Sequence, residues 1–305
     1  MKCLIKRLAI FAGYDKDSII DDYVIYYLSE LSKGADIIYV CDNDLAQKEI
    51  DKIKPYTIEV IAQKHGEYDF GSYKIGYLFA KQNDILEKYD YLILCNDSVF
   101  GPFYDFEKIF AEIPQRQDIA YGFSKHLEAN CDWGGDKHRF IDTHLQSYFV
   151  VLPKFVFLSK WFSDFIKSIK KEADKVEVVF SYEIGMSVLF REHNIELLSH
   201  YESKVDISHL SPLEVLQKHN GAFLKKKTFF LMTFRDICEI FCLIKHNYDM
   251  NLIINHYERN KQELVLAYKD DMLKHKRLNK KISKIARYIP IKALRKRFCD
   301  RYIVR

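Results

Sequence analysis

Several residue types and motifs that would place this chain in a common class are scarce or missing. Its 305 residues include only 6 prolines and 11 glycines, too few for a low-complexity chain. No stretch reaches the roughly 18 consecutive apolar residues of a membrane-spanning helix, and Met1-Lys2-Cys3 leads directly into a predicted strand. We therefore expect neither a transmembrane segment nor a secretory signal.

Phosphate-binding and nucleophile motifs are missing as well. The sequence has no GxxxxGK or GxGxxG loop and no GxSxG turn. Their absence disfavours kinases, dehydrogenases and enzymes with a serine nucleophile elbow.

The cysteines do not form a disulfide pattern. There are 7, an odd number, and none falls in a CxxC pair, which is typical of a reducing cytoplasm. What the chain does have is a hydrophobic content of 48%, with 15% aromatic residues. This composition predicts a soluble enzyme with one large domain and an appendage.

Positive charge is concentrated at the end of the chain. Residues 274–305 contain 13 Lys and Arg residues and one acid, a net charge of +12, whereas residues 1–273 carry −8. Apolar residues in this tail recur at helical spacing on both sides of Pro290. They are Ile282, Ile285, Ala286, Ile289, Ile291, Leu294 and Phe298.

This tail predicts two short basic amphipathic helices on an anionic membrane surface. A nucleic-acid arm is the rival interpretation; the apolar face and the acidic body disfavour it, so we expect no nucleic-acid partner. Packing of the tail on the acidic body of the same chain is a further alternative.

The rest of the sequence alternates strand and helix patterns. Strands are predicted over residues 4–11, 35–41, 57–61, 89–95, 119–123 and 145–151. Helices are predicted over residues 19–31, 45–52, 75–86, 106–113, 154–171 and 183–193, and loops over residues 65–69 and 125–140. This alternation predicts the α/β class with a mostly parallel sheet flanked by helices. Because the pattern beyond Pro212 is helical, the predicted domains are residues 1–211, 212–273 and 274–305.

Two short segments place polar residues beside predicted strand ends. Residues 68–74 read YDFGSYK, and residues 96–102 read NDSVFGP, which puts Asp97 at the carboxyl end of the 89–95 strand. In an open α/β sheet, ligands bind beyond these ends, where a carboxylate can hold a divalent cation against a diphosphate. An ordinary turn is the alternative, since Asn-Asp-Ser before Gly-Pro is common turn chemistry.

Five segments, in their order and spacing, resemble the rhamnan-synthesis F family. They are LAIFAGYD (residues 8–15), the two segments above, HLQSYF (residues 144–149) and Tyr182-Glu183. The resemblance covers roughly residues 5–200 and implies a GT-A-like, Rossmann-related glycosyltransferase that builds bacterial surface polysaccharide. One position departs from the family pattern: Glu67 stands where the family usually has glycine, with Gly66 one place earlier.

The resemblance implies a nucleotide-sugar donor, linked to dTDP, UDP or GDP, and a Mn²⁺ or Mg²⁺ ion. Asp97 is the predicted metal ligand. Because many GT-A enzymes have Asp-x-Asp at this place, one carboxylate predicts weak metal binding without donor. Asp206 or His209 is a candidate second ligand, with a surface role as the alternative for each. Donor-binding roles are predicted for Asp15, Asp69, Lys74, Asn96 and Ser98.

Glu183 is the predicted catalytic base. Residues 182–187, YEIGMS, are similar to the segment that supplies the base in many inverting GT-A enzymes. A carboxylate in a first helical turn also complements the helix dipole, which is the alternative explanation. His144 and Gln146 are predicted to face the acceptor, although strand alternation alone would place both on one face.

These features predict an inverting, metal-dependent hexosyltransferase on the inner, cytoplasmic face of the cell membrane. It would move rhamnose or another deoxyhexose to a lipid-linked or lipopolysaccharide glycan. A nucleotidyltransferase and a non-catalytic membrane-docking assembly protein of the same pathway are the alternatives. The first would require a basic glycine-rich loop after the first strand, and Gly13-Tyr14-Asp15 is not such a loop.

Overall fold

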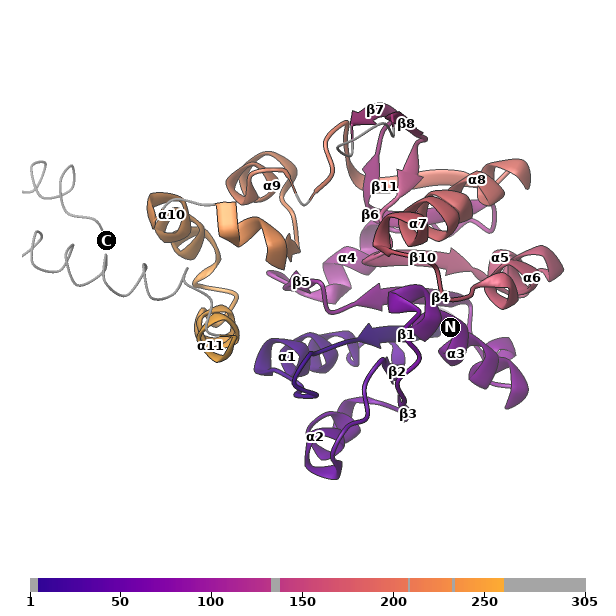
Figure 1. Ribbon diagram of the computed structural model, residues 1–305, viewed down its shortest axis with the longest axis horizontal. Helices are drawn as coiled ribbons and strands as arrows, with labels where there is room; N and C mark the ends of the chain where they lie inside the picture. The colour runs from indigo at the N-terminus through magenta and orange to yellow at the C-terminus, as the bar shows by residue number, and fades with distance from the viewer. Residues whose placement is uncertain (1–4, 133–137, 208, 232–233, 261–305) are drawn as a thin grey trace, which may run out of the picture. The chain divides into compact units, whose positions relative to one another are not determined.

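The computed structural model describes residues 5–132, 138–207, 209–231 and 234–260 (Figure 1). The predicted basic tail, residues 274–305, lies outside these ranges. The chain divides into two compact units, the first of residues 1–228 and the second beginning at Phe229.

The first unit is built on one large mixed sheet. Its strand order is β11-β6-β10-β4-β1-β2-β3, with the short β9 paired to β6. The bounds are β1 (Arg7–Gly13), β2 (Asp36–Cys41), β3 (Glu59–Ala62), β4 (Tyr91–Asn96), β6 (Ile119–His126), β9 (His144–Leu145), β10 (Phe149–Pro153) and β11 (Glu196–Ser203). Neighbours among β1, β2, β3 and β4 are parallel, β6 and β11 are parallel, and β10 runs antiparallel to both β4 and β6.

Two sets of parallel strands are thus joined through one reversed strand, β10. The prediction of a mostly parallel α/β sheet flanked by helices is confirmed. The central strands form because apolar residues are buried on both faces: all six residues of β4, YLILCN, are buried.

Helices cover both faces of this sheet (Figure 1). Alternate residues of each strand point to opposite faces, so Ile10 packs in the cluster that includes Tyr73 of α3, whereas Phe11 contacts Tyr27 of α1 with ring centroids 5.1 Å apart. The helices of this unit are α1 (Asp22–Leu31), α2 (Gln47–Ile53), α3 (Tyr68–Gln82), α4 (Phe106–Glu112), α5 (Lys154–Phe157), α6 (Lys160–Ser168), α7 (Lys175–Val178), α8 (Gly185–Glu192) and α9 (Pro212–His219).

The structure corrects several predicted elements. The single strand predicted over residues 145–151 is two strands, β9 and β10, and β11 was not predicted. The helix predicted from residue 75 begins at Tyr68, so Asp69 lies in its first turn and not in a loop. The predicted loop over residues 125–140 contains the antiparallel pair β7 (Ala129–Asp132) and β8 (His138–Ile141). The single helix predicted over residues 154–171 is two helices, α5 and α6.

A small second sheet ties a distant segment to the end of β4. Strand β12 (Leu224–Lys225) pairs antiparallel with β5 (Val99–Phe100), with Lys225 opposite Val99. This pairing joins α9 and β12 to the first unit, whose last residue is Thr228.

The described part of the second unit is helical. It contains α10 (Phe234–Ile244) and α11 (Asn251–Arg259), and the rings of Phe229 and Tyr257 lie 6.0 Å apart within it. No helix within the described ranges combines the length and the apolar content needed to cross a membrane.

Candidate functional site

Asn96, the last residue of β4, is the centre of a polar network at the carboxyl edge of the sheet. It is only 4% exposed. Its Nδ2 donates to Oδ2 of Asp69 at 3.0 Å, and its Oδ1 accepts from Oγ of Ser98 at 2.5 Å. Asn96 therefore fixes two predicted donor-binding side chains relative to each other, because a buried amide is held in place by the hydrogen bonds it makes.

Glu183, which lies in a helical segment, is connected to the same network through Ser147. Its Oε1 accepts from the backbone N–H of Ser147 at 2.8 Å, and Oγ of Ser147 lies 3.4 Å from Oδ2 of Asp69. Ser147 thus connects the predicted base with Asp69, although the two carboxylates come from segments far apart in the sequence.

The position of Glu183 in its helix removes the dipole explanation. The chain is helical without a break through α7, the π-helical turn η3 (Val179–Ile184) and α8, so Glu183 lies well inside this stretch and not in its first turn. The helix dipole acts mainly within the terminal turns. A π-turn inside an α-helix is frequent at functional sites, because it changes the direction in which a side chain points.

The surroundings of Glu183 shift its protonation toward neutral pH. Burial raises the pKa of this carboxyl to about 7, and the negative charges of Asp69 and Asp206 act in the same direction. The positive charge of Lys225 and the hydrogen bond from Ser147 oppose the rise. A carboxylate with a pKa near the working pH is suited to general-base catalysis.

Lys225 is a site residue that the sequence analysis missed. Its Nζ donates to Oγ of Ser98 at 2.7 Å and lies 4.7 Å from the ring centroid of Tyr148. Burial lowers the pKa of this ammonium group, while Glu183, Asp206 and Asp69 raise it. Lys225 therefore brings a positive charge to the part of the sheet edge where three carboxylates act on it.

Gly101 explains how Lys225 reaches this position. Its φ is +132°, a backbone conformation that residues with a side chain rarely adopt, and a Cβ at this place would lie 2.4 Å from the carbonyl oxygen of Ala222. The glycine of the NDSVFGP segment lets residues 222–225 approach the chain just after β4. This segment therefore does more than form a turn.

Asp206, which follows β11, is the third carboxylate of this edge. Its Oδ2 accepts from Nε2 of Gln146 at 2.8 Å, and Oε1 of Gln146 accepts from Oγ of Ser124 at 2.8 Å. Gln146 is buried, with 5% of its surface exposed, and its hydrogen bond orients the carboxylate of Asp206. Its predicted contact with the acceptor stays a prediction.

His144 is also buried. It is 4% exposed, its Nδ1 lies 2.8 Å from the carbonyl oxygen of Asp142, and its ring stacks with that of His126 at 5.3 Å between centroids. Burial lowers the pKa of His144, which favours its neutral form. Its predicted contact with the acceptor likewise stays a prediction.

Asp97 faces a different part of the edge from Asn96 and Glu183. It lines a cavity between the end of β1 and α1, together with Asp15, Tyr14 and Tyr23. The backbone N–H of Tyr14 donates to Oδ2 of Asp97 at 3.1 Å. The carboxylate of Asp15 accepts from the N–H of Asp17 at 2.9 Å, so it also shapes the loop after β1. The structure thus places two predicted residues, Asp15 and Asp97, in one cavity.

The residues at this edge fit a metal ion only in part. The carboxylate oxygens of Asp97 are suitable ligands for Mg²⁺ or Mn²⁺. Within the described ranges, however, no three His, Cys, Asp or Glu side chains gather as a metal-binding group. His209 is exposed, and in the described part of the chain its imidazole makes no hydrogen bond or ion pair; its backbone N–H donates to the carbonyl of Asp206 at 2.8 Å. The donor diphosphate and water would have to complete the ligand shell.

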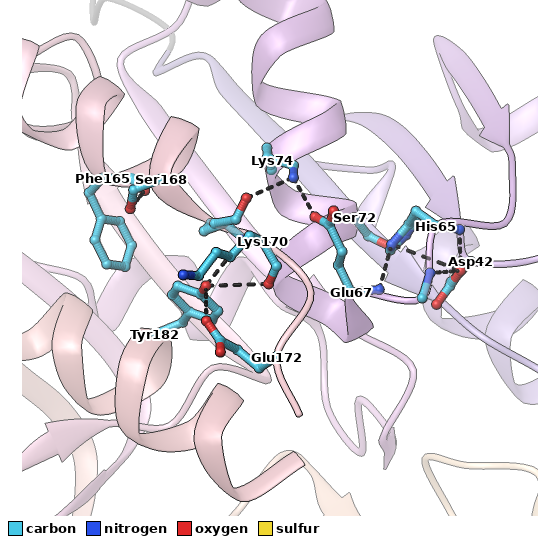
Figure 2. A network of polar contacts seen from close by, with 12 residues as sticks. Asp42, His65, Glu67, Ser72, Lys74, Phe165, Ser168, Lys170, Glu172 and Tyr182 are labelled. Atoms are coloured by element: carbon cyan, nitrogen blue, oxygen red, sulfur yellow. Dashed lines mark hydrogen bonds and ion pairs between the residues drawn. The ribbon is translucent and has the colours of Figure 1, made fainter. Parts of the chain in front are cut away.

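Lys74 lies in a network of its own (Figure 2). Its Nζ forms an ion pair with Glu67 and donates to the carbonyl oxygen of Ile169 at 2.8 Å. The residue that departs from the family pattern, Glu67, is therefore the partner of Lys74. The predicted contact of Lys74 with a donor phosphate stays a prediction, since its ammonium group is already held by two protein groups.

The loop before α3 is anchored by Asp42, as Figure 2 also shows. Oδ1 of Asp42 accepts from the N–H groups of His65 at 2.6 Å and Gly66 at 2.8 Å. Gly71 is required one turn into α3, because a Cβ there would lie 2.4 Å from Cβ of Glu67 and 2.6 Å from Nδ1 of His65. These contacts fix the start of α3 and with it the position of Asp69.

Comparison with known proteins identifies the family. The family model of rhamnan synthesis protein F matches residues 37–291. The chain belongs to the rhamnan synthesis protein F family. The match begins after the LAIFAGYD segment and continues past residue 200, so it includes Lys225.

One relative of this chain is the uncharacterized protein y4gN of Sinorhizobium fredii. It is 25% identical over 210 residues, which cover 68% of this chain and 52% of the relative. The chain thus spans about half the length of the curated relative it matches.

Solved structures with a similar arrangement include enzymes of two kinds. A 4-diphosphocytidyl-2C-methyl-D-erythritol synthase is 8% identical, with a TM-score of 0.42 and coverage of 64% of this chain and 89% of that one. The mannosyltransferase Ktr4p of S. cerevisiae, in complex with GDP, is 10% identical, with a TM-score of 0.39 and coverage of 63% and 68%. A glycosyltransferase that acts in glycosylation of the major capsid of PBCV-1 is 12% identical, with a TM-score of 0.35 and coverage of 72% and 92%.

Proposed function

We propose that this protein transfers a sugar, rhamnose or another deoxyhexose, from a dTDP-, UDP- or GDP-linked donor to a growing surface polysaccharide or lipopolysaccharide acceptor. The observation that carries the proposal is the surroundings of Glu183. Its carboxylate is held by the N–H of Ser147, faces Lys225, and has a pKa of about 7 at the edge of the sheet where ligands bind. Membership of the rhamnan synthesis protein F family supports the same class of reaction.

In the proposed reaction Glu183 acts as the general base. Its carboxylate takes the proton from an acceptor hydroxyl, and the acceptor oxygen forms a bond to the anomeric carbon of the donor sugar. The bond between that carbon and the diphosphate oxygen breaks, and the electron pair leaves with the diphosphate. Attack on the face opposite the leaving group inverts the anomeric configuration.

The other residues of the edge hold the donor and the base. The buried Asn96 holds Asp69 and Ser98 beside the donor, and these two side chains present hydrogen-bonding groups to the sugar or diphosphate. Asp15 borders the nucleotide at the end of β1. A Mn²⁺ or Mg²⁺ ion, when bound with the donor, would neutralise charge on the diphosphate, and Asp97 is the residue that would hold it.

We further propose that the protein works at the inner face of the cell membrane, facing the cytoplasm. The support is the sequence of residues 274–305, with a net charge of +12 and apolar residues at helical spacing. An anionic lipid surface would attract this tail and bring the enzyme to a lipid-linked acceptor.

Release of nucleoside diphosphate from a panel of dTDP-, UDP- and GDP-sugars tests the proposed reaction. We expect release from one donor class, stimulation by Mn²⁺ or Mg²⁺, and a product of inverted anomeric configuration by nuclear magnetic resonance. Formation of a nucleotide sugar from a nucleoside triphosphate and a sugar 1-phosphate, with release of pyrophosphate, would indicate a nucleotidyltransferase. Binding of acceptor glycan without turnover of any donor would indicate a non-catalytic assembly protein.

A further inference from the structure

Lys225, the last residue of β12, and Lys226, which follows it, make separate contacts at the segment between β4 and β5. Nζ of Lys225 donates to Ser98, whereas Nζ of Lys226 lies 2.5 Å from the hydroxyl of Tyr23, which in turn donates to the carbonyl oxygen of Asp97 at 2.9 Å. The backbone N–H of Lys226 donates to the carbonyl oxygen of Ser98 at 3.1 Å. The pairing of Lys225 with Val99 and this backbone hydrogen bond of Lys226 therefore fix the positions from which the two side chains extend.

The ammonium group of Lys225 has capacity for a ligand. It carries three N–H donors, and among the described residues it donates one hydrogen bond, to Ser98. No carboxylate oxygen of the described chain lies within 4.0 Å of it, although Glu183, Asp206 and Asp69 all act on its charge. The side chain is half-buried, so a ligand at the edge of the sheet can reach it.

The carboxylates of the site would repel a phosphate ligand unless the ammonium group of Lys225 contacts it. Glu183, Asp206 and Asp69 bring three carboxylates, and the charge of the exposed Lys175 also acts on Lys225. A diphosphate adds further negative charge, which is repelled at short range unless a positive group contacts it directly. Lys225 is placed for that contact, whereas the ammonium group of Lys74 is held by Glu67 and Ile169.

We infer that Lys225 binds the diphosphate of the donor and stabilises the negative charge that develops on it as the bond to the sugar breaks. This inference rests on the proposed function and assigns to Lys225 the phosphate contact that the sequence had placed at Lys74. The bond that breaks joins the anomeric carbon to the diphosphate oxygen; the electron pair stays on that oxygen, beside the ammonium group, and no proton has to leave Lys225.

Calorimetric binding of UDP, GDP, dTDP and inorganic pyrophosphate, each tested alone with EDTA and then with Mn²⁺, measures this contact directly. We expect Lys225→Met to weaken binding of the preferred nucleoside diphosphate and of pyrophosphate by about ten- to a hundredfold, as loss of a charge-assisted hydrogen bond does. Lys225→Arg keeps the charge and should retain most of the affinity. Lys227→Met is the matched control, since Lys227 is an exposed neighbour in the same segment, and should bind as the parent does.

Steady-state kinetics with the preferred donor then separate this inference from the proposed function. If Lys225→Met, folded as judged by circular dichroism, binds diphosphate as tightly as the parent, or if both Lys225→Met and Lys225→Arg keep parental kcat and donor KM, the role of Lys225 is wrong while sugar transfer stands. If the parent binds diphosphates in a Lys225-dependent manner yet releases none from any nucleotide sugar, the phosphate site stands and the transferase proposal is wrong. If the parent binds neither nucleoside diphosphate nor pyrophosphate, Lys225 is not a phosphate ligand.

Discussion

Replacement of Glu183 by glutamine removes the proposed base while keeping the shape of the site. The glutamine oxygen can still accept the hydrogen bond that Ser147 donates at 2.8 Å, so the helix and the network around Asp69 should stay in place. Loss of a general base commonly lowers turnover by about 10² to 10⁴-fold, which corresponds to roughly 3 to 5 kcal/mol of transition-state stabilisation. We expect Glu183→Gln to lower kcat within this range and to leave donor affinity within about twofold, because the base acts in the chemical step.

The pH dependence of kcat is a second test of the Glu183→Gln substitution. The pKa of Glu183 is raised to about 7, so the carboxyl is protonated below that pH and a base only above it. The kcat of the parent should therefore fall by about tenfold per pH unit below the pKa and level off above it. The variant has no group that titrates at this position, so its small residual rate should be flat over the same range.

The comparison uses kcat at saturating donor and acceptor from pH 5.5 to 9, with circular dichroism to show that both proteins are folded. A variant rate within a few fold of the parent would refute the reasoning and move the base to another residue, with Asp69 the next candidate. A low rate that keeps the acid limb near pH 7 would show that a different group is responsible for that limb.

Three further predictions test other parts of the structure. Asp97→Asn should abolish stimulation of transfer by Mn²⁺ or Mg²⁺ without unfolding the protein, and an unchanged metal dependence would make Asp97 a loop-forming residue only. Lys74→Met should lower the free energy of unfolding, measured in urea, by about 1 to 3 kcal/mol, because Glu67 and the carbonyl of Ile169 lose their partner. Adding Glu67→Gln to this variant should recover part of the loss. An unchanged urea midpoint for Lys74→Met would show that the Lys74–Glu67 pair does not stabilise the fold. Deletion of residues 274–305 should release the protein from anionic liposomes and slow transfer to a lipid-linked acceptor, with activity on a short soluble acceptor kept; equal sedimentation with liposomes for both proteins would show that the tail does not bind lipid.

The central strands of the sheet could be predicted from the sequence because they are continuous apolar runs with polar residues at their ends. Strand β11, ELLSHYES, was not predicted, because it has no such run. Every residue of β4 is buried, and the motif that follows it was placed correctly at the carboxyl edge. The start of α3 was not predicted, because the segment YDFGSYK contains glycine and polar residues that obscure the helical period. There Gly71 is required by the close contact with His65 and Glu67, and this need is visible only in three dimensions.

The site could be predicted only where its residues lie in a recognisable segment. Lys225 lies 127 positions from Ser98, and β12 is two residues long, so no periodic pattern marks it. The π-turn at Glu183 likewise leaves no signal, because it differs from an α-helix only in which carbonyl each N–H reaches. Gly101 is the residue in a recognisable segment that relates to Lys225: because it has no side chain, residues 222–225 can approach the chain after β4.

Mass spectrometry of a lipid-linked or lipopolysaccharide acceptor incubated with a nucleotide sugar tests the central claim most directly. The parent protein should extend the acceptor by the mass of one hexose or deoxyhexose and release one nucleoside diphosphate for each sugar transferred, and Glu183→Gln should do so at least about 10² times more slowly. The claim would be contradicted if no dTDP-, UDP- or GDP-sugar supports extension by the parent with Mn²⁺ or Mg²⁺ present, or if parent and variant extend the acceptor at the same rate.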